Sequence, residues 1–167
     1  MTQPKTMTRI IQTLLIVAIV VFPRYISAQE MDNSKMEKIL TEVSDSISGE
    51  AGYWEIKVAG IQMMCISDSN HNRMRIITPV SKTENLKKGQ LKACMEANFH
   101  SALDVKYAIS DDFIWVVFIH PLKELSDRQL RDGVSQVWNA AYTFGSTYSS
   151  TNLLFPGNDK KEKTKKM

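Results

Sequence analysis

The chain has 167 residues, of which 43% are hydrophobic, so it is long enough to bury a core without disulfides or bound metals. It carries 21 lysines and arginines against 18 aspartates and glutamates. Three of the basic residues, Lys5, Arg9 and Arg24, lie in the first 28 residues, which contain no acidic residue. The rest of the chain is therefore neutral by count, which argues against broad electrostatic binding of nucleic acid.

Residues 1–28 have the parts of a secretory signal peptide. A positively charged start is followed by an apolar stretch at residues 10–22, which is shorter than the roughly 18 to 20 residues that span a bilayer. The small side chain of Ala28 suits a signal peptidase, so we predict cleavage before Gln29. An uncleaved signal anchor is the alternative, because Arg24 follows the apolar stretch.

The first half of the remaining chain predicts one helix and three strands. Residues 34–48 place apolar side chains at helical spacing, and Ser34 and Glu37 are typical of a capping box at a helix start. Alternating hydrophobicity then predicts strands at residues 53–58, 61–67 and 73–80. The second strand is apolar at nearly every position, which predicts a central strand covered on both faces.

The second half predicts two helices that flank a strand pair. A second helix is expected at residues 86–101, and strands at residues 105–109 and 113–120, the last of which is apolar on both faces and expected to be well buried. Ser126 and Gln129 form a second capping box, so the third helix begins there, and Gly145 is its expected cap. Residues 156–167 carry five lysines and predict a disordered tail.

These elements describe a single α+β domain at residues 29–155, in the order α-β-β-β-α-β-β-α. The hairpin at 53–67, the strand at 73–80 and the segment at 97–138 make the chain similar to the type III secretion chaperone-like fold, including the bacterial YbjN-type domains. The resemblance implies a five-stranded antiparallel sheet with three helices, and domains that bind other polypeptides or pair with themselves. The leader departs from secretion chaperones, which stay in the cytoplasm, so the effector-chaperone role is not implied.

The sequence holds no set of residues typical of catalysis, a metal site or a bound cofactor. Cys65 and Cys94 are the only cysteines, and export would take both into an oxidising compartment. They are interpreted as two buried free thiols, with a Cys65–Cys94 disulfide and a reactive thiol as alternatives. The three histidines lack metal-ligand spacing, and no glycine-rich phosphate loop is present.

We therefore expect a non-enzymatic module, exported to the periplasm or secreted, that binds a partner protein or a second copy of itself, with no cofactor and no nucleic acid. Its candidate interaction surface combines apolar positions of the second helix with charged positions of the third strand, namely Leu91, Met95, Phe99, Arg73 and Arg75. The alternatives are a small thiol-dependent or hydrolytic periplasmic enzyme and a membrane-tethered accessory protein with an uncleaved signal anchor.

Overall fold

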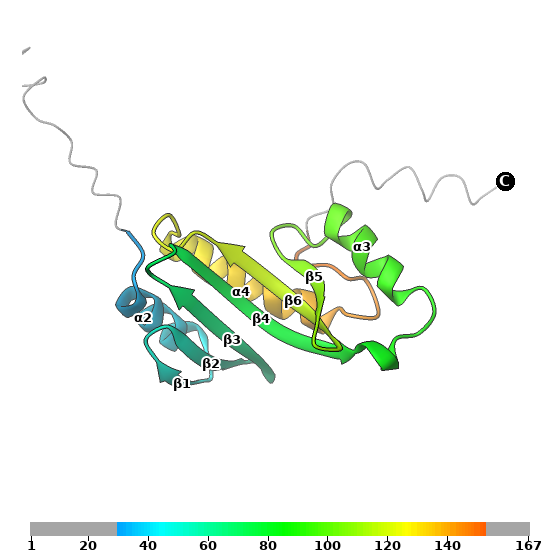
Figure 1. Cartoon of the computed structure of the whole chain (residues 1–167), viewed down its shortest axis with the longest axis horizontal. Coiled ribbons are helices and arrows are strands. Elements are labelled where there is room, and N and C mark those ends of the chain that lie inside the picture. The colour runs from blue at the N-terminus through cyan, green and yellow to red at the C-terminus, as the bar shows by residue number, and fades with distance from the viewer. Residues whose placement is uncertain (1–29, 153–167) are drawn as a thin grey trace, which may run out of the picture.

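The computed structural model describes residues 30–152, which form one antiparallel sheet of six strands with helices packed against one of its faces (Figure 1). The strands lie in the order β1-β2-β3-β4-β6-β5, which places β6 between β4 and the edge strand β5. The elements in chain order are α2 (Asn33–Val43), β1 (Ser46–Glu50), β2 (Tyr53–Val58), β3 (Ile61–Asp68), β4 (Arg73–Lys82), a 3₁₀ turn (Thr83–Asn85), α3 (Gln90–His100), β5 (Lys106–Ser110), β6 (Phe113–His120) and α4 (Asp127–Tyr142).

The α+β class, the three helices and the antiparallel sheet are confirmed, but the sheet has six strands rather than five. The first helix ends at Val43, and Ser46–Glu50 forms an edge strand paired with β2. Gly49 makes this hairpin possible, because a Cβ at that position would lie 2.3 Å from the carbonyl oxygen of Tyr53. The order is therefore α-β-β-β-β-α-β-β-α.

Three helix boundaries also differ from the prediction. Asp32 caps α2 by accepting a 2.8 Å hydrogen bond from the Lys35 amide, so the predicted Ser34 capping box is wrong. Helix α3 begins only at Gln90, because Gly89 before it adopts a left-handed conformation with φ of 89°. Helix α4 ends at Tyr142, before the predicted glycine cap. The predicted leader, its cleavage site and the lysine-rich tail lie outside the described residues.

The start of α4 confirms the second capping box. The Ser126 side chain accepts a hydrogen bond from the Gln129 amide, and the Gln129 side chain accepts one from the Ser126 amide. Leu130, Val134 and Val137 then face the sheet and are buried. Gly133 lets the helix approach closely, since a Cβ there would lie 2.9 Å from the ring of Phe118.

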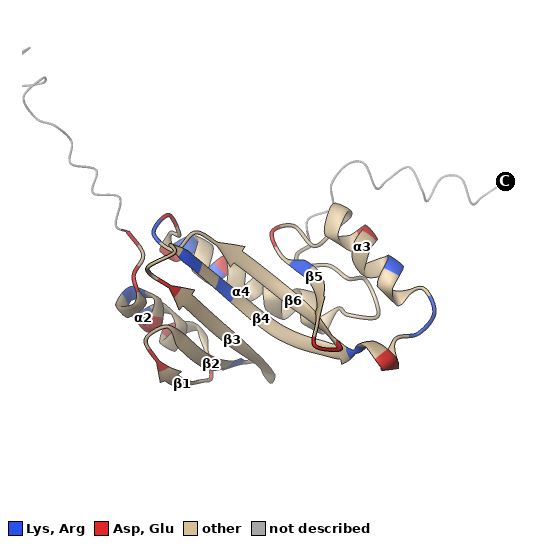
Figure 2. Ribbon diagram, viewed as in Figure 1, with Lys and Arg blue, Asp and Glu red and all other residues tan. Residues whose placement is uncertain are grey.

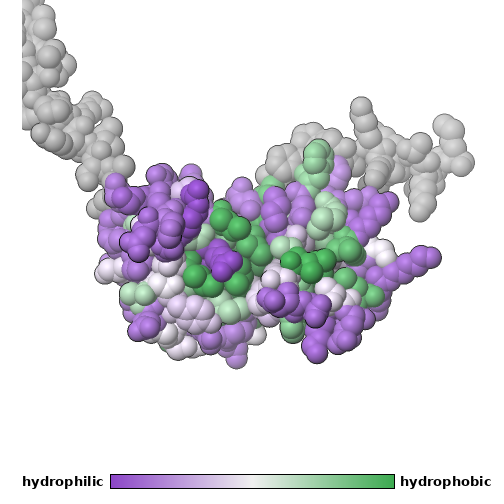
Figure 3. Space-filling model, viewed as in Figure 1, coloured by the Kyte–Doolittle hydropathy of each residue, from purple (hydrophilic) through white to green (hydrophobic). Residues whose placement is uncertain are grey.

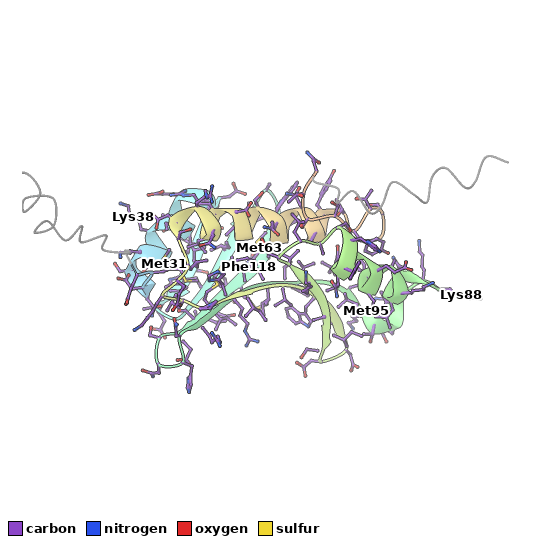
Figure 4. All side chains as sticks on the ribbon, turned by 90° about the horizontal axis from the view of Figure 1, so that it is seen from above. Met31, Lys38, Met63, Lys88, Met95 and Phe118 are labelled. Atoms are coloured by element: carbon purple, nitrogen blue, oxygen red, sulfur yellow. The ribbon has the colours of Figure 1, made fainter. Side chains whose placement is uncertain are left out.

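The hydrophobic core lies between the sheet and the layer formed by α2 and α4. Figure 4 shows Met63 of β3 and Phe118 of β6 in this layer, with α4 above them. Cys65, Ile76 and Val116 have no more than trace exposure and occupy the same side of their strands. Within residues 30–152, none of the helices has the length and hydrophobicity needed to span a membrane.

Helix α3 lies at the far end of the sheet and covers the edge of β5. The Asn98 side chain donates to the Tyr107 carbonyl at 3.1 Å and accepts from the Tyr107 amide at 2.7 Å. It therefore pairs with β5 as a neighbouring strand would, which protects part of that edge from other chains. The Tyr107 hydroxyl donates to the carbonyl of Ala140 at 2.8 Å and joins this end of the sheet to α4.

Candidate functional site

The sheet face opposite α2 and α4 is not covered by any helix of residues 30–152 (Figure 4). Register places two rows of side chains on it across β3, β4 and β6. We call these residues the open sheet face: Ile66, Arg75 and Ile119 in the first row, and Met64, Ile77 and Val117 in the second. Figure 3 views this side of the molecule and shows hydrophobic surface gathered over the middle strands.

Exposure of this face corrects the prediction that β3 and β6 are covered on both sides. Ile119 of β6 keeps 63% of its surface exposed, and Met64 and Ile66 of β3 are only half-buried. The sequence predicted apolar residues on both faces of these strands, and the structure confirms that pattern. The second apolar face is available for contact because nothing in the described part of the chain packs on it.

Arg75 is a cation inside the apolar part of this face. Its cross-strand neighbours are Ile66 on one side and Ile119 on the other. No hydrogen bond or ion pair joins its guanidinium to another residue between 30 and 152. Figure 2 shows blue bands near the start of β4, beside β6, which is drawn in tan.

Arg73 is in a different position, although it lies on the same face as Arg75. It stands opposite Asp68 of β3 and donates to the Asn72 carbonyl at 3.3 Å. Asp68 is held by the turn, since it accepts from the amides of Asn70 and His71 and lies 2.6 Å from the His71 ring nitrogen. That hydrogen bond to His71 is the main cause of a lowered Asp68 pKa. Arg73 therefore has a carboxylate as its cross-strand neighbour, whereas both cross-strand neighbours of Arg75 are isoleucines.

A hollow of about 360 Å³ lies at the end of the open sheet face that holds Arg73 and Arg75. Its walls include the apolar side chains of Ile66 and Ile119, and both Arg73 and Arg75 line it. The hollow is broad and shallow rather than a closed cavity, so it suits a side chain or two of a larger partner better than an enclosed small molecule.

The second uncovered apolar surface is a stripe on α3, made of Leu91, Met95 and Phe99. These residues are four positions apart, and 43%, 48% and 83% of their surfaces are exposed, respectively. The opposite side of the helix, with Cys94 and Ala97, is buried. We call this set the α3 stripe, and Figure 4 labels Met95 on it.

The structure divides the predicted interaction surface into two parts. Arg73 and Arg75 lie near the start of β4, at the end of the sheet close to α2, whereas the α3 stripe lies at the other end (Figure 1). Ile66 and Ile119, which flank Arg75, were not singled out in the sequence. Their alternation within apolar strands was visible, but their closeness to Arg75 depends on β6 pairing with β4.

The thiols and histidines do not form a catalytic arrangement. Both cysteines are free and buried, Cys65 on β3 and Cys94 on α3. Burial raises the pKa of the Cys65 thiol to about 12, and burial also raises that of Cys94, so neither forms the reactive thiolate at neutral pH. His120 donates to the Pro121 carbonyl at 2.8 Å. Between residues 30 and 152, no cluster of three or more acidic, histidine or cysteine side chains suits a metal ion.

A buried glutamine that the sequence did not single out joins two aspartates. The Gln136 side-chain amide donates to Asp104 at 2.9 Å and to Asp132 at 2.8 Å, and its oxygen accepts from the Asp104 backbone amide at 3.2 Å. Both carboxylates are thus committed to the same amide group, which ties the loop before β5 to α4. This is a structural connection rather than an acid pair for catalysis.

Comparison with known proteins finds similarity at the level of the fold. No protein-family model matches the chain, and no curated protein matches its sequence. A chain of the HopA1–SchA chaperone–effector complex aligns over 67% of this chain and 88% of its own length, with a TM-score of 0.51 and 8% identity.

Two further complexes give similar alignments. A chain from the complex of the Yersinia pestis type III secretion chaperone SycH with a stable fragment of YscM2 has a TM-score of 0.52 and 16% identity, covering 68% of this chain and 98% of that one. A chain of the ExsC–ExsE complex has a TM-score of 0.50 and 13% identity, covering 66% and 92%. The fold is therefore similar to that of type III secretion chaperones.

Proposed function

We propose that this protein is a non-enzymatic protein-binding module, exported to the periplasm or secreted, that holds a partner protein or a second copy of itself. The observation that carries the proposal is the presence of two uncovered apolar surfaces, the open sheet face and the α3 stripe, on a domain whose core is otherwise complete. Exposed apolar patches of this kind mark protein interaction sites in soluble proteins. The buried thiols and the committed carboxylates argue against an enzyme.

The structural neighbours support a polypeptide as the partner. The three solved structures described above are a chaperone–effector complex, a chaperone bound to a fragment of another protein, and a two-protein complex. Export rests on the pattern of the first 28 residues alone, and it distinguishes this protein from chaperones that remain beside their effectors in the cytoplasm.

The α3 stripe fits a helix-to-helix contact between two copies. Leu91 and Phe99 are eight positions apart, with Met95 midway, which is about 12 Å along the helix axis. In an antiparallel pair of α3 helices centred on Met95, Leu91 of each copy would face Phe99 of the other, which is the self-complementary geometry of a two-fold dimer. Such a contact would bury the most exposed apolar side chain of the domain, Phe99.

The mass of the native protein tests the proposal. We expect light scattering to give protein isolated from the exported fraction the mass of a dimer, or of a complex with one partner. Replacement of Phe99 by glutamate should release a monomer, because a charge would then be buried in the contact. Tyr142→Ser is the control, since it removes another exposed aromatic side chain, 71% exposed against 83% for Phe99, from α4. A wild-type monomer with no partner would contradict the proposal.

Export is tested separately by N-terminal sequencing of the same material. A sequence that starts at Gln29 supports cleavage and a released protein. An intact leader would support the alternative of a membrane-tethered accessory protein, without changing the account of the binding surfaces.

A further inference from the structure

We infer that the hollow on the open sheet face binds a segment of a partner protein in which an acidic side chain lies between apolar side chains. The carboxylate of that segment would pair with Arg75, and its apolar neighbours would pack on Ile66 and Ile119. The inference rests on the proposed function and gives the chemistry of the partner at one of the two surfaces.

Covering Arg75 with a purely apolar partner is energetically costly. Arg75 is exposed, has isoleucines as its two cross-strand neighbours, and has no carboxylate partner among the described residues. A purely apolar partner would bury this cation unpaired, which costs several kcal/mol. A partner with a carboxylate would instead form a charge-assisted hydrogen bond in apolar surroundings, where such bonds are strong. The face therefore selects apolar segments that carry an acid.

Another copy of the same face is a poor occupant of the hollow. Pairing of two open sheet faces would bring two Arg75 side chains toward one another. The acidic residue of the hollow, Asp68, is already bound by His71 and two backbone amides, and Glu55 in the neighbouring row accepts a hydrogen bond from the Tyr53 hydroxyl at 3.1 Å. Both carboxylates already have hydrogen-bond partners within their own copy, so pairing with a second copy's Arg75 would compete with those contacts.

The parts of this chain that lie outside the described residues do not have the sequence that the hollow requires. Residues 1–29 contain no aspartate or glutamate, so they cannot supply the carboxylate. Residues 153–167 contain Asp159 and Glu162, but both stand directly beside lysines and neither is flanked by apolar residues. A segment of another protein therefore fits the hollow better than either end of the chain.

The experiment is an NMR titration of the purified, isotope-labelled protein with three short synthetic peptides. All three peptides are built of serine and glycine around a central triplet, which is leucine-glutamate-leucine, leucine-glutamine-leucine or leucine-lysine-leucine. We expect the glutamate peptide to bind at least about tenfold more tightly than the glutamine peptide, and the lysine peptide to bind weakest. The shifted amide signals should come from β3, β4 and β6 around Arg75.

Matched variants locate the effect. Arg75→Gln should remove the preference for the glutamate peptide. The control Arg128→Gln also removes one positive charge, but from α4 on the other side of the sheet, and it should leave the preference intact. Arg73→Gln should have a smaller effect than Arg75→Gln, because Asp68 already faces Arg73.

Four results would overturn the inference: equal affinity for the glutamate and glutamine peptides, a preference that survives Arg75→Gln, signals that shift on α3 instead, or no binding by any of the three peptides at millimolar concentration. Signals of the open sheet face that change on simple dilution would show a second copy as its occupant and would also overturn it. The Phe99→Glu variant keeps the two proposals apart, since it should lose self-association and keep the peptide preference. A failed titration with an intact native complex would count against this inference alone.

Discussion

Two neighbouring methionines on β3 test whether the sheet really has one core face and one open face. Met63 points toward α4 and has no exposed surface, while Met64 points to the open sheet face and is half-buried. Replacement of each by alanine removes the same atoms from the same strand, so any change in strand propensity is shared. The difference between the two variants therefore reports the packing on the two faces.

The magnitudes follow from burial. Met63→Ala should cost about 2 to 5 kcal/mol, because it leaves a cavity in a packed core. Met64→Ala should cost about 1 kcal/mol, because only part of the side chain is removed from water and no cavity forms. A 3 kcal/mol loss lowers the urea midpoint by about 1.5 to 2 M.

The assay is urea unfolding followed by tryptophan fluorescence and circular dichroism on the same samples. If Met63→Ala does not fold, the milder pair Ile76→Val and Ile77→Val on β4 gives the same comparison, with about 1 kcal/mol expected at the buried Ile76 and less at Ile77. Equal losses for the two members of a pair would refute the account, because they would mean that a second layer covers the open sheet face.

Further predictions concern the helix start, the close helix-to-sheet contact and the thiols. Ser126→Ala removes the α4 cap and should cost about 1 kcal/mol in urea unfolding; a neutral result would show that the cap is unimportant. Gly133→Ala should cost about 1 to 3 kcal/mol, because the new Cβ meets the Phe118 ring, and a gain in stability would contradict that contact. Denatured, unreduced protein should show two free thiols, with Cys65 unreactive before unfolding; a count of zero would establish the Cys65–Cys94 disulfide instead.

Elements with both a periodic pattern and a local boundary signal could be predicted well from the sequence. Strand β6 was predicted with its observed bounds because its apolar run is closed by Asp111 and Asp112 on one side and Pro121 on the other. The start of α4 followed from the Ser126 capping box. In these places the local physical chemistry decides the structure without help from the rest of the chain.

Strand β1 could not be predicted, because the sequence around it satisfies a helical pattern. Ile47 continues the apolar spacing of α2, and the flanking serines and Gly49 have little strand propensity. The strand forms because pairing with β2 places Ile47 against the core, with Gly49 opposite Trp54. Tertiary pairing outweighs local preference here.

The candidate site was only partly visible for a similar reason. Arg73 and Arg75 were placed on one side of a strand by their spacing, and the α3 stripe by its helical period. The apolar surroundings of Arg75 depend on β6 lying beside β4, a pairing that joins residues more than forty positions apart and has no local signal. Whether a helix covers the second face of the sheet also depends on where the helices pack, and hydrophobic periodicity alone does not determine this.

Site-specific photo-crosslinking in the producing cell would show whether the open sheet face and the α3 stripe contact other proteins. A photoreactive residue would replace Ile119 on the open sheet face, Phe99 on the α3 stripe, or Arg128 on α4 as the control position. The account predicts a discrete crosslinked polypeptide at Ile119, a second copy of the chain or a partner at Phe99, and none at Arg128. Monomer alone at both test positions would contradict the claim that these apolar surfaces hold other proteins.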